Sequence, residues 1–216
     1  MKAVVIERKE DNDSYIKRAS QMLKSSLKKG DVNVTKPRLN NIKLKIMHFP
    51  SFIISKLSRG ITHSCLYLGN GNVLEIGTTL TDSKIKKLSL ESLLKSKMRL
   101  FGGVTVYAIQ PKYYKLKHRE RAVKLAVNNF LKRSKEVVFS HFNMLKLGLG
   151  LILKRNKFSG KELLKFKRDW NCSELTAHIL KKANIKIGKR RAKFFLPSTF
   201  VFSKHFKTKK KVILKR

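Results

Sequence analysis

Three side chains with reactive chemistry stand out in this sequence: an imidazole, a carboxylate and a thiol. His63 and Glu75 flank the Gly-Asn-Gly-Asn segment 69–72, and Cys172 begins an apolar, helix-forming stretch much later in the chain. A thiolate can attack a carbonyl carbon, an imidazole can accept and return a proton, and a carboxylate can orient the imidazole. We therefore take these three residues as candidate catalytic residues.

The relative position of His63 and Glu75 depends on the register of a predicted β-hairpin. Two apolar runs enclose segment 69–72, which is a strong hairpin signal. A two-residue turn at Asn70-Gly71 would place His63 and Glu75 on opposite faces, because side chains alternate along a strand. A three-residue turn over 69–71 would place them on the same face, in diagonal positions. We favour the three-residue turn because it puts Gly71 where a left-handed residue is needed.

Cys172 is predicted to lie in the first turn of a helix that continues through Ala183. Its inward face is an apolar stripe that includes Cys172 itself, together with Leu175, Thr176, Ile179 and Leu180. The amides and the dipole at a helix start favour a thiolate, and the Cys172 amide could donate to an oxyanion. A cysteine buried only for packing remains the alternative interpretation.

The other reactive residues fit structural roles better. Cys65 lies in mid-strand beside His63 without a helix start, so we expect it to pack in the core. His141 and His178 are isolated and are expected in core or surface positions. The cysteines and histidines show no metal-ligand spacing, so neither a metal nor another cofactor is expected.

The two reactive segments resemble a known protein family. Residues 62–75, THSCLYLGNGNVLE, are similar to the "SHxGIYxGxGxVxEA" block of the circularly permuted NlpC-type, papain-like cysteine hydrolases, the YiiX-like group related to lecithin retinol acyltransferase. Residues 171–175, NCSEL, are similar to the later "xCSELV" helix start of that family. The order His, Glu, Cys is the permuted order. Thr62 replaces the usual Ser, and Glu75 is followed by Ile76 and then Gly77 where an Ala usually follows the Glu, which bears on the shape of the pocket.

The resemblance implies an α+β, permuted papain-like fold in which an antiparallel sheet packs against the helix that carries the nucleophilic cysteine. It implies Cys172 as nucleophile, His63 as base and Glu75 as the third polar residue. The implied substrate is an amide in a peptide, such as a cell-wall peptide, or an acyl ester or amide, cleaved through a thioester. Hydrolase and acyltransferase share this nucleophile, and the sequence does not separate them.

The resemblance covers roughly residues 45–203, which sets the expected domain boundaries. Residues 1–44 are then an N-terminal extension with a basic amphipathic helix, and residues 204–216 a basic, mobile tail. Periodicity and turn residues predict the remaining elements: a helix from Asp13 to about Gly30, a loop or irregular edge over 31–48, a short helix over 50–57, helices over 88–98 and 118–133, and a strand over 105–109.

Charge is the other strong feature of the chain. Lysine and arginine total 51 against 13 acidic residues, for a net charge of +38, and no acidic residue follows Glu174. Such a surface is expected near a polyanion, whether nucleic acid, an acidic protein or an anionic surface, although a merely solvated lysine-rich surface is an equal alternative. An alternative function is therefore a non-catalytic basic protein on the same fold, for example within a virion.

Targeting signals are not evident in the sequence. No apolar run approaches the ~18–20 residues of a membrane span. The N-terminal apolar run is too short for a signal peptide and is followed by acidic residues. We therefore expect a cytoplasmic or virion-associated protein.

Overall fold

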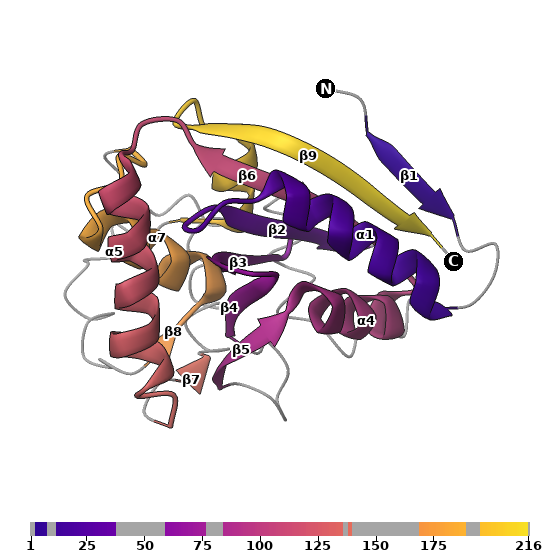
Figure 1. Cartoon of the computed structure of the whole chain (residues 1–216), viewed down its shortest axis with the longest axis horizontal. Coiled ribbons are helices and arrows are strands. Elements are labelled where there is room, and N and C mark those ends of the chain that lie inside the picture. Colours follow the sequence, from indigo (N-terminus) through magenta and orange to yellow (C-terminus); the bar gives the residue numbers. More distant parts are fainter. Residues whose placement is uncertain are drawn as a thin grey trace, which may run out of the picture.

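The computed structural model of the 216-residue chain describes residues 3–7, 12–37, 59–76, 84–135, 138–139, 169–188 and 195–215. In this part of the chain, strands form one seven-stranded sheet in the order β1-β9-β6-β2-β3-β4-β5, together with a two-stranded β7-β8 sheet (Figure 1). The strands are β1 (Val4–Glu7), β2 (Val32–Pro37), β3 (His63–Gly69), β4 (Asn72–Ile76), β5 (Ile85–Ser89), β6 (Gly103–Pro111), β7 (Val138–Phe139), β8 (Asp169–Trp170) and β9 (Phe206–Lys215). The helices are α1 (Asn12–Ser26), α4 (Leu90–Phe101), α5 (Leu116–Leu125), the π-helical η1 (Ala126–Leu131), α7 (Cys172–Lys182) and α8 (Pro197–Phe202). The protein has a mixed α+β fold.

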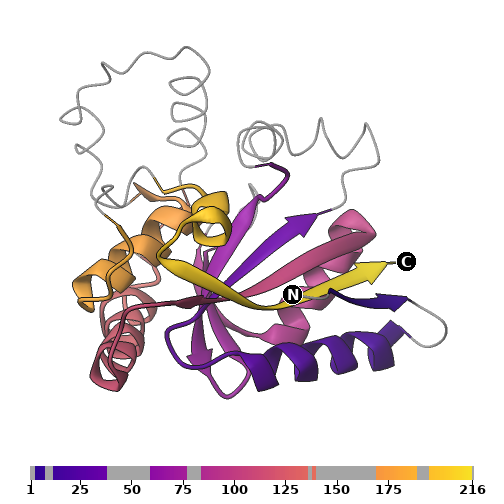
Figure 2. The ribbon, with the colours of Figure 1, turned by 90° about the horizontal axis from the view of Figure 1, so that it is seen from above.

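The large sheet is antiparallel apart from one edge. β1 pairs with β9 in parallel, and each other neighbouring pair runs antiparallel. The first and last strands of the described chain therefore lie side by side, as Figure 2 shows from above. β9 pairs with β6 along its whole length, from Gly103↔Lys215 to Pro111↔Phe206.

Helices cover both faces of the sheet, and each face has its own apolar core. α1 and α4 pack on the face that carries Cys65 and Tyr67 of β3. α7, η1 and α8 contribute to the core on the opposite face, with Leu66 and Leu68. All seven residues of β3 are buried, because side chains that alternate between two covered faces are all removed from water.

β2 corrects the interpretation of residues 31–48. We expected a loop or an irregular edge, but Val32–Pro37 form a strand between β6 and β3, near the centre of the sheet. Val32 and Val34 belong to the α7 core, while Asn33 and Thr35 are buried on the other face. Because two of these buried positions are polar, the segment lacks the apolar run that predicts a buried strand. Residues 38–48 and the short helix predicted over 50–57 lie outside the described residues.

β9 corrects the interpretation of the C-terminus. The prediction of a mobile tail over 204–216 is wrong, since Phe206–Lys215 form a strand between β6 and β1. Val212 and Leu214 are fully buried against the α1 side of the sheet. The sheet also takes β1 and β2 from the predicted N-terminal extension. The seven-stranded sheet therefore includes strands from the predicted extension, domain and tail, and it crosses both predicted boundaries.

Other predicted elements are confirmed. The helix from Asp13 is α1, with Ile16, Ala19 and Leu23 buried. The helix over 88–98 is α4, and the Ser89 hydroxyl accepts a hydrogen bond from the Ser92 amide at 3.0 Å. The strand over 105–109 lies in β6, and the helix over 118–133 is α5 continued by η1. Among the described helices, none is both long and apolar enough for a bilayer span.

Candidate active site

The β3-β4 hairpin combines features of both turns considered from the sequence. Asn70 and Gly71 form a two-residue turn with φ of 53° and 77°, so the prediction of a three-residue turn is wrong. The register shifts between Tyr67 and Gly69, and this irregularity inserts one extra residue into β3. The body of the hairpin therefore has the register that we favoured, with Leu66 opposite Leu74.

This register brings His63 and Glu75 together. Nε2 of His63 lies 3.0 Å from Oε1 of Glu75, and the two residues are 2% and 5% exposed. Neither ring nitrogen makes a hydrogen bond of good geometry to a described residue, so the contact is a short ion pair rather than a linear hydrogen bond. Catalytic hydrogen bonds are often poorly aligned before substrate binds. The Glu75 carboxylate therefore fixes one side of the imidazole mainly by charge.

Lys97 is a third charged group in this cluster, and it was not among the residues predicted from the sequence. Its ammonium Nζ lies 3.0 Å from Oε1 of Glu75, the same oxygen that contacts His63. Lys97 is buried on α4, beside Leu93, Leu94 and Met98. The available signal was spacing, because Lys97 falls three and four residues after two apolar positions of the inward stripe.

Cys172 reaches the cluster from α7, at the start of β3. Its sulfur lies 4.0 Å from the Thr62 carbonyl oxygen, and the thiol is close enough to the His63 ring and the Ser64 amide for both to lower its pKa. His63 and Glu75 point to the α4 face of the sheet, while α7 packs on the other face. The candidate site is therefore assembled at one end of β3 by helices from both faces.

Local hydrogen bonds hold the first turn of α7 in place. Asn171 is the N-cap, and its Oδ1 accepts from the Glu174 amide at 2.7 Å. The Ser173 hydroxyl donates to the Phe195 carbonyl at 2.6 Å, which ties the helix start to the segment before α8. The Cys172 side chain is therefore positioned by its neighbours on both sides in sequence.

Charge shifts the thiol and the imidazole in opposite directions. Burial would raise the pKa of Cys172, but the charge and proximity of His63, the Ser64 amide and the Lys97 charge together lower it. Burial and the Lys97 charge would lower the pKa of His63, but Cys172 and Glu75 together raise it. These directions favour a thiolate beside an imidazolium.

The carboxylate of the cluster is held ionised. Burial would raise the pKa of Glu75, but the Lys97 and His63 charges hold it well below its ordinary range. Glu75 can therefore balance the charge of an imidazolium throughout the neutral pH range.

The remaining candidates have other environments. Cys65 lies with its sulfur 3.6 Å from the Asn33 carbonyl oxygen, and burial together with the Glu75 charge raises its thiol pKa well above the ordinary value. His178 packs edge-on against Trp170, and burial lowers its pKa. His141 lies outside the described residues. No three metal-ligating side chains gather within the described part of the chain.

Comparisons of this chain with known protein families, with curated proteins and with solved structures find no match. The interpretation of the cluster therefore depends on its chemistry. A thiol at a helix start, an adjoining imidazole and a buried carboxylate are the groups that nucleophilic acyl transfer requires.

Proposed function

We propose that this protein is a cysteine hydrolase on a permuted papain-like fold, with Cys172, His63 and Glu75 as its catalytic residues. The observation that carries the proposal is one continuous chain of contacts. The Cys172 thiol adjoins the His63 ring, and Nε2 of that ring lies 3.0 Å from Glu75. The similarity of residues 62–75 and 171–175 to the two family blocks supports it from the sequence.

The proposed reaction divides amide or ester cleavage into two steps. The Cys172 thiolate attacks the carbonyl carbon, and the carbonyl oxygen becomes an oxyanion that the Cys172 amide can stabilise. The His63 imidazolium gives its proton to the leaving amine or alcohol, and a thioester remains. His63 then takes a proton from water, whose oxygen attacks the thioester and releases the acid and the thiolate. Because Nε2 faces Glu75, Nδ1 is the nitrogen left to exchange this proton.

Lys97 gives the cluster a balance of charges. The thiolate and the Glu75 carboxylate carry two negative charges, and the His63 imidazolium and the Lys97 ammonium carry two positive ones. A buried set of charges is tolerable only if each has a close opposite partner. Lys97 thus orients Glu75 and keeps it ionised when His63 gives up its proton.

Alkylation by iodoacetamide tests whether Cys172 is activated. Cys65 is an internal control, since both thiols are 1% exposed in the same molecule. At pH 7 we expect Cys172 to react at least about tenfold faster than Cys65, as measured by peptide mass spectrometry, because only its pKa is lowered. In His63→Ala this difference should disappear. Equal, slow alkylation of the two cysteines in the unaltered protein would remove the case for an activated thiol.

A panel of acyl donors then tests catalysis. We expect p-nitrophenyl esters of increasing chain length, or peptide anilides, to add an acyl group to Cys172 that intact-mass measurement detects. Cys172→Ala should not form this adduct. Adding a primary amine separates the two reaction types, because a hydrolase releases the acid while an acyltransferase releases the amide. Failure of every donor to acylate Cys172 would contradict an acyl-transfer role.

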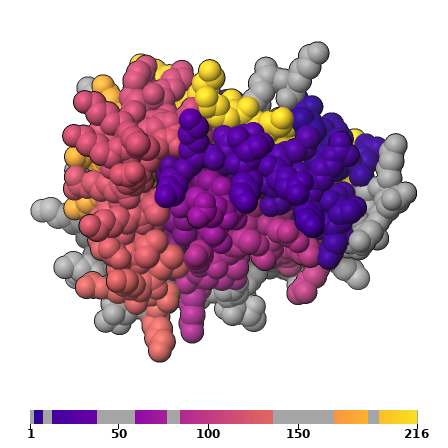
Figure 3. Space-filling model, in the orientation of Figure 1, coloured from indigo at the N-terminus to yellow at the C-terminus, as the bar shows by residue number. Residues whose placement is uncertain are grey.

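Polyanion binding is the second candidate function, and the charge of +38 favours it. α1 and α5 occupy neighbouring parts of the face shown in Figure 3. Exposed cations lie along both helices and include Lys17, Arg18, Lys24, Lys117, Arg121 and Lys124. α5 is joined to the turn that follows α1, where Arg119 Nη1 donates to the Lys29 carbonyl at 3.1 Å. The face therefore offers cations from two elements to one extended ligand.

Salt dependence tests this second candidate. Binding of duplex DNA should weaken steeply as salt rises, because phosphate contacts release counterions. Cys172→Ala should bind equally well, since the thiol lies apart from this face. Binding that is absent at low salt, or that does not change with salt, would contradict a polyanion-binding role.

A further inference from the structure

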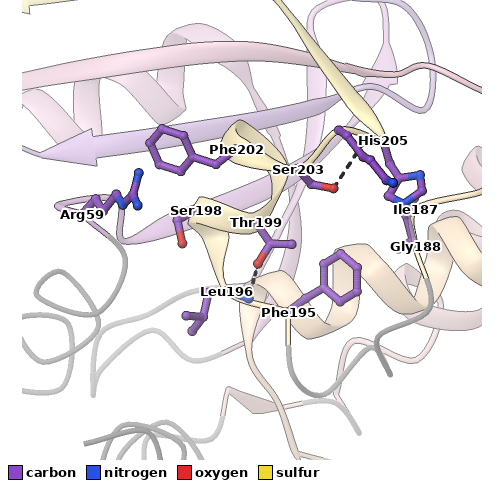
Figure 4. A pocket seen from close by; sticks show the side chains of 11 residues that line it. Arg59, Ile187, Gly188, Phe195, Leu196, Ser198, Thr199, Phe202, Ser203 and His205 are labelled. Atoms are coloured by element: carbon purple, nitrogen blue, oxygen red, sulfur yellow. Dashed lines mark hydrogen bonds between the residues drawn. The ribbon is translucent and has the colours of Figure 1, made fainter.

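A pocket of about 530 Å³ is lined by residues of α8 and of the segments next to it (Figure 4). Phe195 lines it, and the carbonyl of the same residue accepts the hydrogen bond from Ser173, the residue after Cys172. Arg59 also lines it, three residues before Thr62, whose carbonyl oxygen lies 4.0 Å from the Cys172 sulfur. Consecutive Cα atoms are ~3.8 Å apart, so the Arg59 backbone is within about 11 Å of Thr62. Two chain connections therefore link the pocket to the thiol.

The charged side chains that line the pocket within the described part of the chain are cationic. They are Arg59 and Lys204, and none of the described lining residues is a carboxylate. The Arg59 guanidinium lies over the Phe202 ring, 4.8 Å from its centroid. Among the described residues, no acidic side chain pairs with Arg59. Stacking orients the guanidinium plane and leaves its N–H edge available for a ligand.

The two ends of the pocket differ in chemistry. In Figure 4 the Ser198 hydroxyl lies at the same end as Arg59, whereas Gly188 and His205 lie at the other. The apolar side chains of Phe195 and Ile187 line the space as well, and both residues are buried. One end therefore offers hydrogen-bond donors with positive charge, and the rest combines the apolar surfaces of Phe195 and Ile187 with the polar side chains of Thr199, Ser203 and His205. An anionic group attached to a chain that is part apolar and part polar matches this arrangement.

We propose that this pocket binds the acidic group of the substrate, a carboxylate or a phosphate, through Arg59 and Ser198, while the acyl carbon reaches Cys172. The inference rests on the proposed acyl-transfer function of Cys172. A guanidinium binds carboxylate or phosphate through two parallel hydrogen bonds, which a neutral amide cannot reproduce. The preferred substrates are therefore acyl compounds with a negative charge near the bond that is cleaved.

Three thiol-reactive probes test the pocket. Each carries the same chloroacetamide group, attached to a glutamyl, a glutaminyl or a phosphoseryl residue. We expect Cys172 to be labelled about fivefold faster by at least one acidic probe than by the neutral glutaminyl probe, from the strength of a partly exposed charge-assisted pair. The faster acidic probe identifies carboxylate or phosphate. Arg59→Gln should reduce the advantage below about twofold, and Ser198→Ala should reduce it in part.

A control variant separates this site from the general charge of the protein. Lys117→Gln removes one exposed cation from α5, outside the pocket. It should keep the preference for acidic probes, and circular dichroism should show that all variants fold. Equal labelling by acidic and neutral probes would overturn the proposal. An equal loss of the preference for acidic probes in Lys117→Gln and Arg59→Gln would overturn it as well.

Binding to an inactive variant distinguishes failure of the pocket from failure of the proposed function. A fluorescent, unreactive glutamyl or phosphoseryl amide is titrated into Cys172→Ala and followed by polarisation. Binding that depends on Arg59 would support the pocket even if no probe labelled Cys172, and the acyl-transfer proposal alone would then fail. Binding of both amides that is unchanged by Arg59→Gln would overturn the pocket.

Discussion

The ammonium of Lys97 and the carboxylate of Glu75 form a buried ion pair, with Nζ and Oε1 3.0 Å apart. They come from a helix and a strand that are adjacent in the fold, and the same carboxylate oxygen contacts His63. A carboxylate shared in this way is fixed from two directions. The pair therefore links the stability of the α4 side of the sheet to the orientation of the imidazole.

Replacement of Lys97 by methionine tests this link. Lys97→Met leaves Glu75 buried with His63 as its remaining charged partner, so we expect the free energy of unfolding to fall by about 3 kcal/mol. Lys95→Met is the matched control. Lys95 lies two residues away on α4 and pairs with Asp13 at 2.9 Å, but its side chain is 40% exposed, so we expect a much smaller loss of stability. Urea unfolding measures both, and equal losses would argue against a special role for Lys97.

The pH dependence of Cys172 alkylation follows from the directions of its pKa shifts. The thiolate is the reactive form, and the His63 and Lys97 charges together with the Ser64 amide lower the thiol pKa from 9.0. The midpoint of the rate-versus-pH curve should therefore lie below pH 9. In His63→Ala the burial remains while the main favourable charge is lost, so the midpoint should move upward.

Lys97→Met should also shift the curve of Cys172 alkylation rate against pH, which a purely structural role of Lys97 would not do. The Lys97 charge lowers the pKa of both Cys172 and His63. Its removal should therefore raise both pKa values, and the Cys172 midpoint should move to higher pH. Lys95→Met should leave the curve unchanged. An unchanged midpoint in Lys97→Met would show that Lys97 does not act on the thiol.

The parts of the site that sequence could predict are those set by local pattern. Helical spacing placed Cys172 at the start of α7, and strand alternation placed His63 and Glu75 on one face. Lys97 was missed because a lysine at an apolar helix position is ordinarily exposed, and its carboxylate partner lies in another element. The fit between Lys97 and Glu75 depends on tertiary packing, which periodicity does not report.

The strands β2 and β9 were not predicted from the sequence for a different reason, which is their polar composition. β2 is half polar, and the first part of β9 carries Lys207, Lys209, Lys210 and Lys211. Lysines are depleted in strands on average, and a basic terminal run is typical of a solvated tail. Pairing with β6 overrides this local preference, because a neighbouring strand supplies the backbone partners. Val212 and Leu214 were the available apolar signal.

Deletion of residues 206–216 tests whether β9 is part of the fold. The deletion removes a strand that pairs with both β6 and β1 and that buries Val212 and Leu214 completely. We expect loss of cooperative thermal unfolding, since two neighbouring strands and the α1 core are exposed. A triple change to glutamine at 209–211 removes charge but keeps the strand, and it should still unfold cooperatively. A deletion variant with an unchanged melting temperature would restore the tail interpretation.

The buried pair of Asp31 and Arg119 gives a prediction about stability and pH. Arg119 Nη2 lies 3.2 Å from Asp31 Oδ1, and the Lys28 amide donates to Asp31 Oδ2 at 2.9 Å. Burial nevertheless raises the pKa of Asp31 from 3.8 to about 6, and burial lowers the pKa of Arg119. Removal from water thus outweighs the attraction between the two charges.

The sign of the pH effect follows from this raised pKa. Between pH 3.8 and about 6 the folded protein holds a proton on Asp31 that the unfolded chain has released. The contribution of this group to stability therefore decreases as pH rises through that range, by on the order of 2–3 kcal/mol in total. Glu75, whose pKa is lowered, acts in the opposite direction, and stability from Glu75 is lost as pH falls below its unfolded pKa of 4.5.

Comparison of variants isolates the Asp31 contribution from that of Glu75. The free energy of unfolding of the unaltered protein and of Asp31→Asn is measured by urea at intervals from pH 4 to pH 6.5. Asparagine keeps an acceptor for the Lys28 amide but cannot titrate, so the difference between the two proteins should shift in favour of Asp31→Asn as pH rises. Because Glu75 is present in both, its effect cancels in the difference. A difference that stays constant across this range would show that Asp31 titrates alike in the folded and unfolded chain.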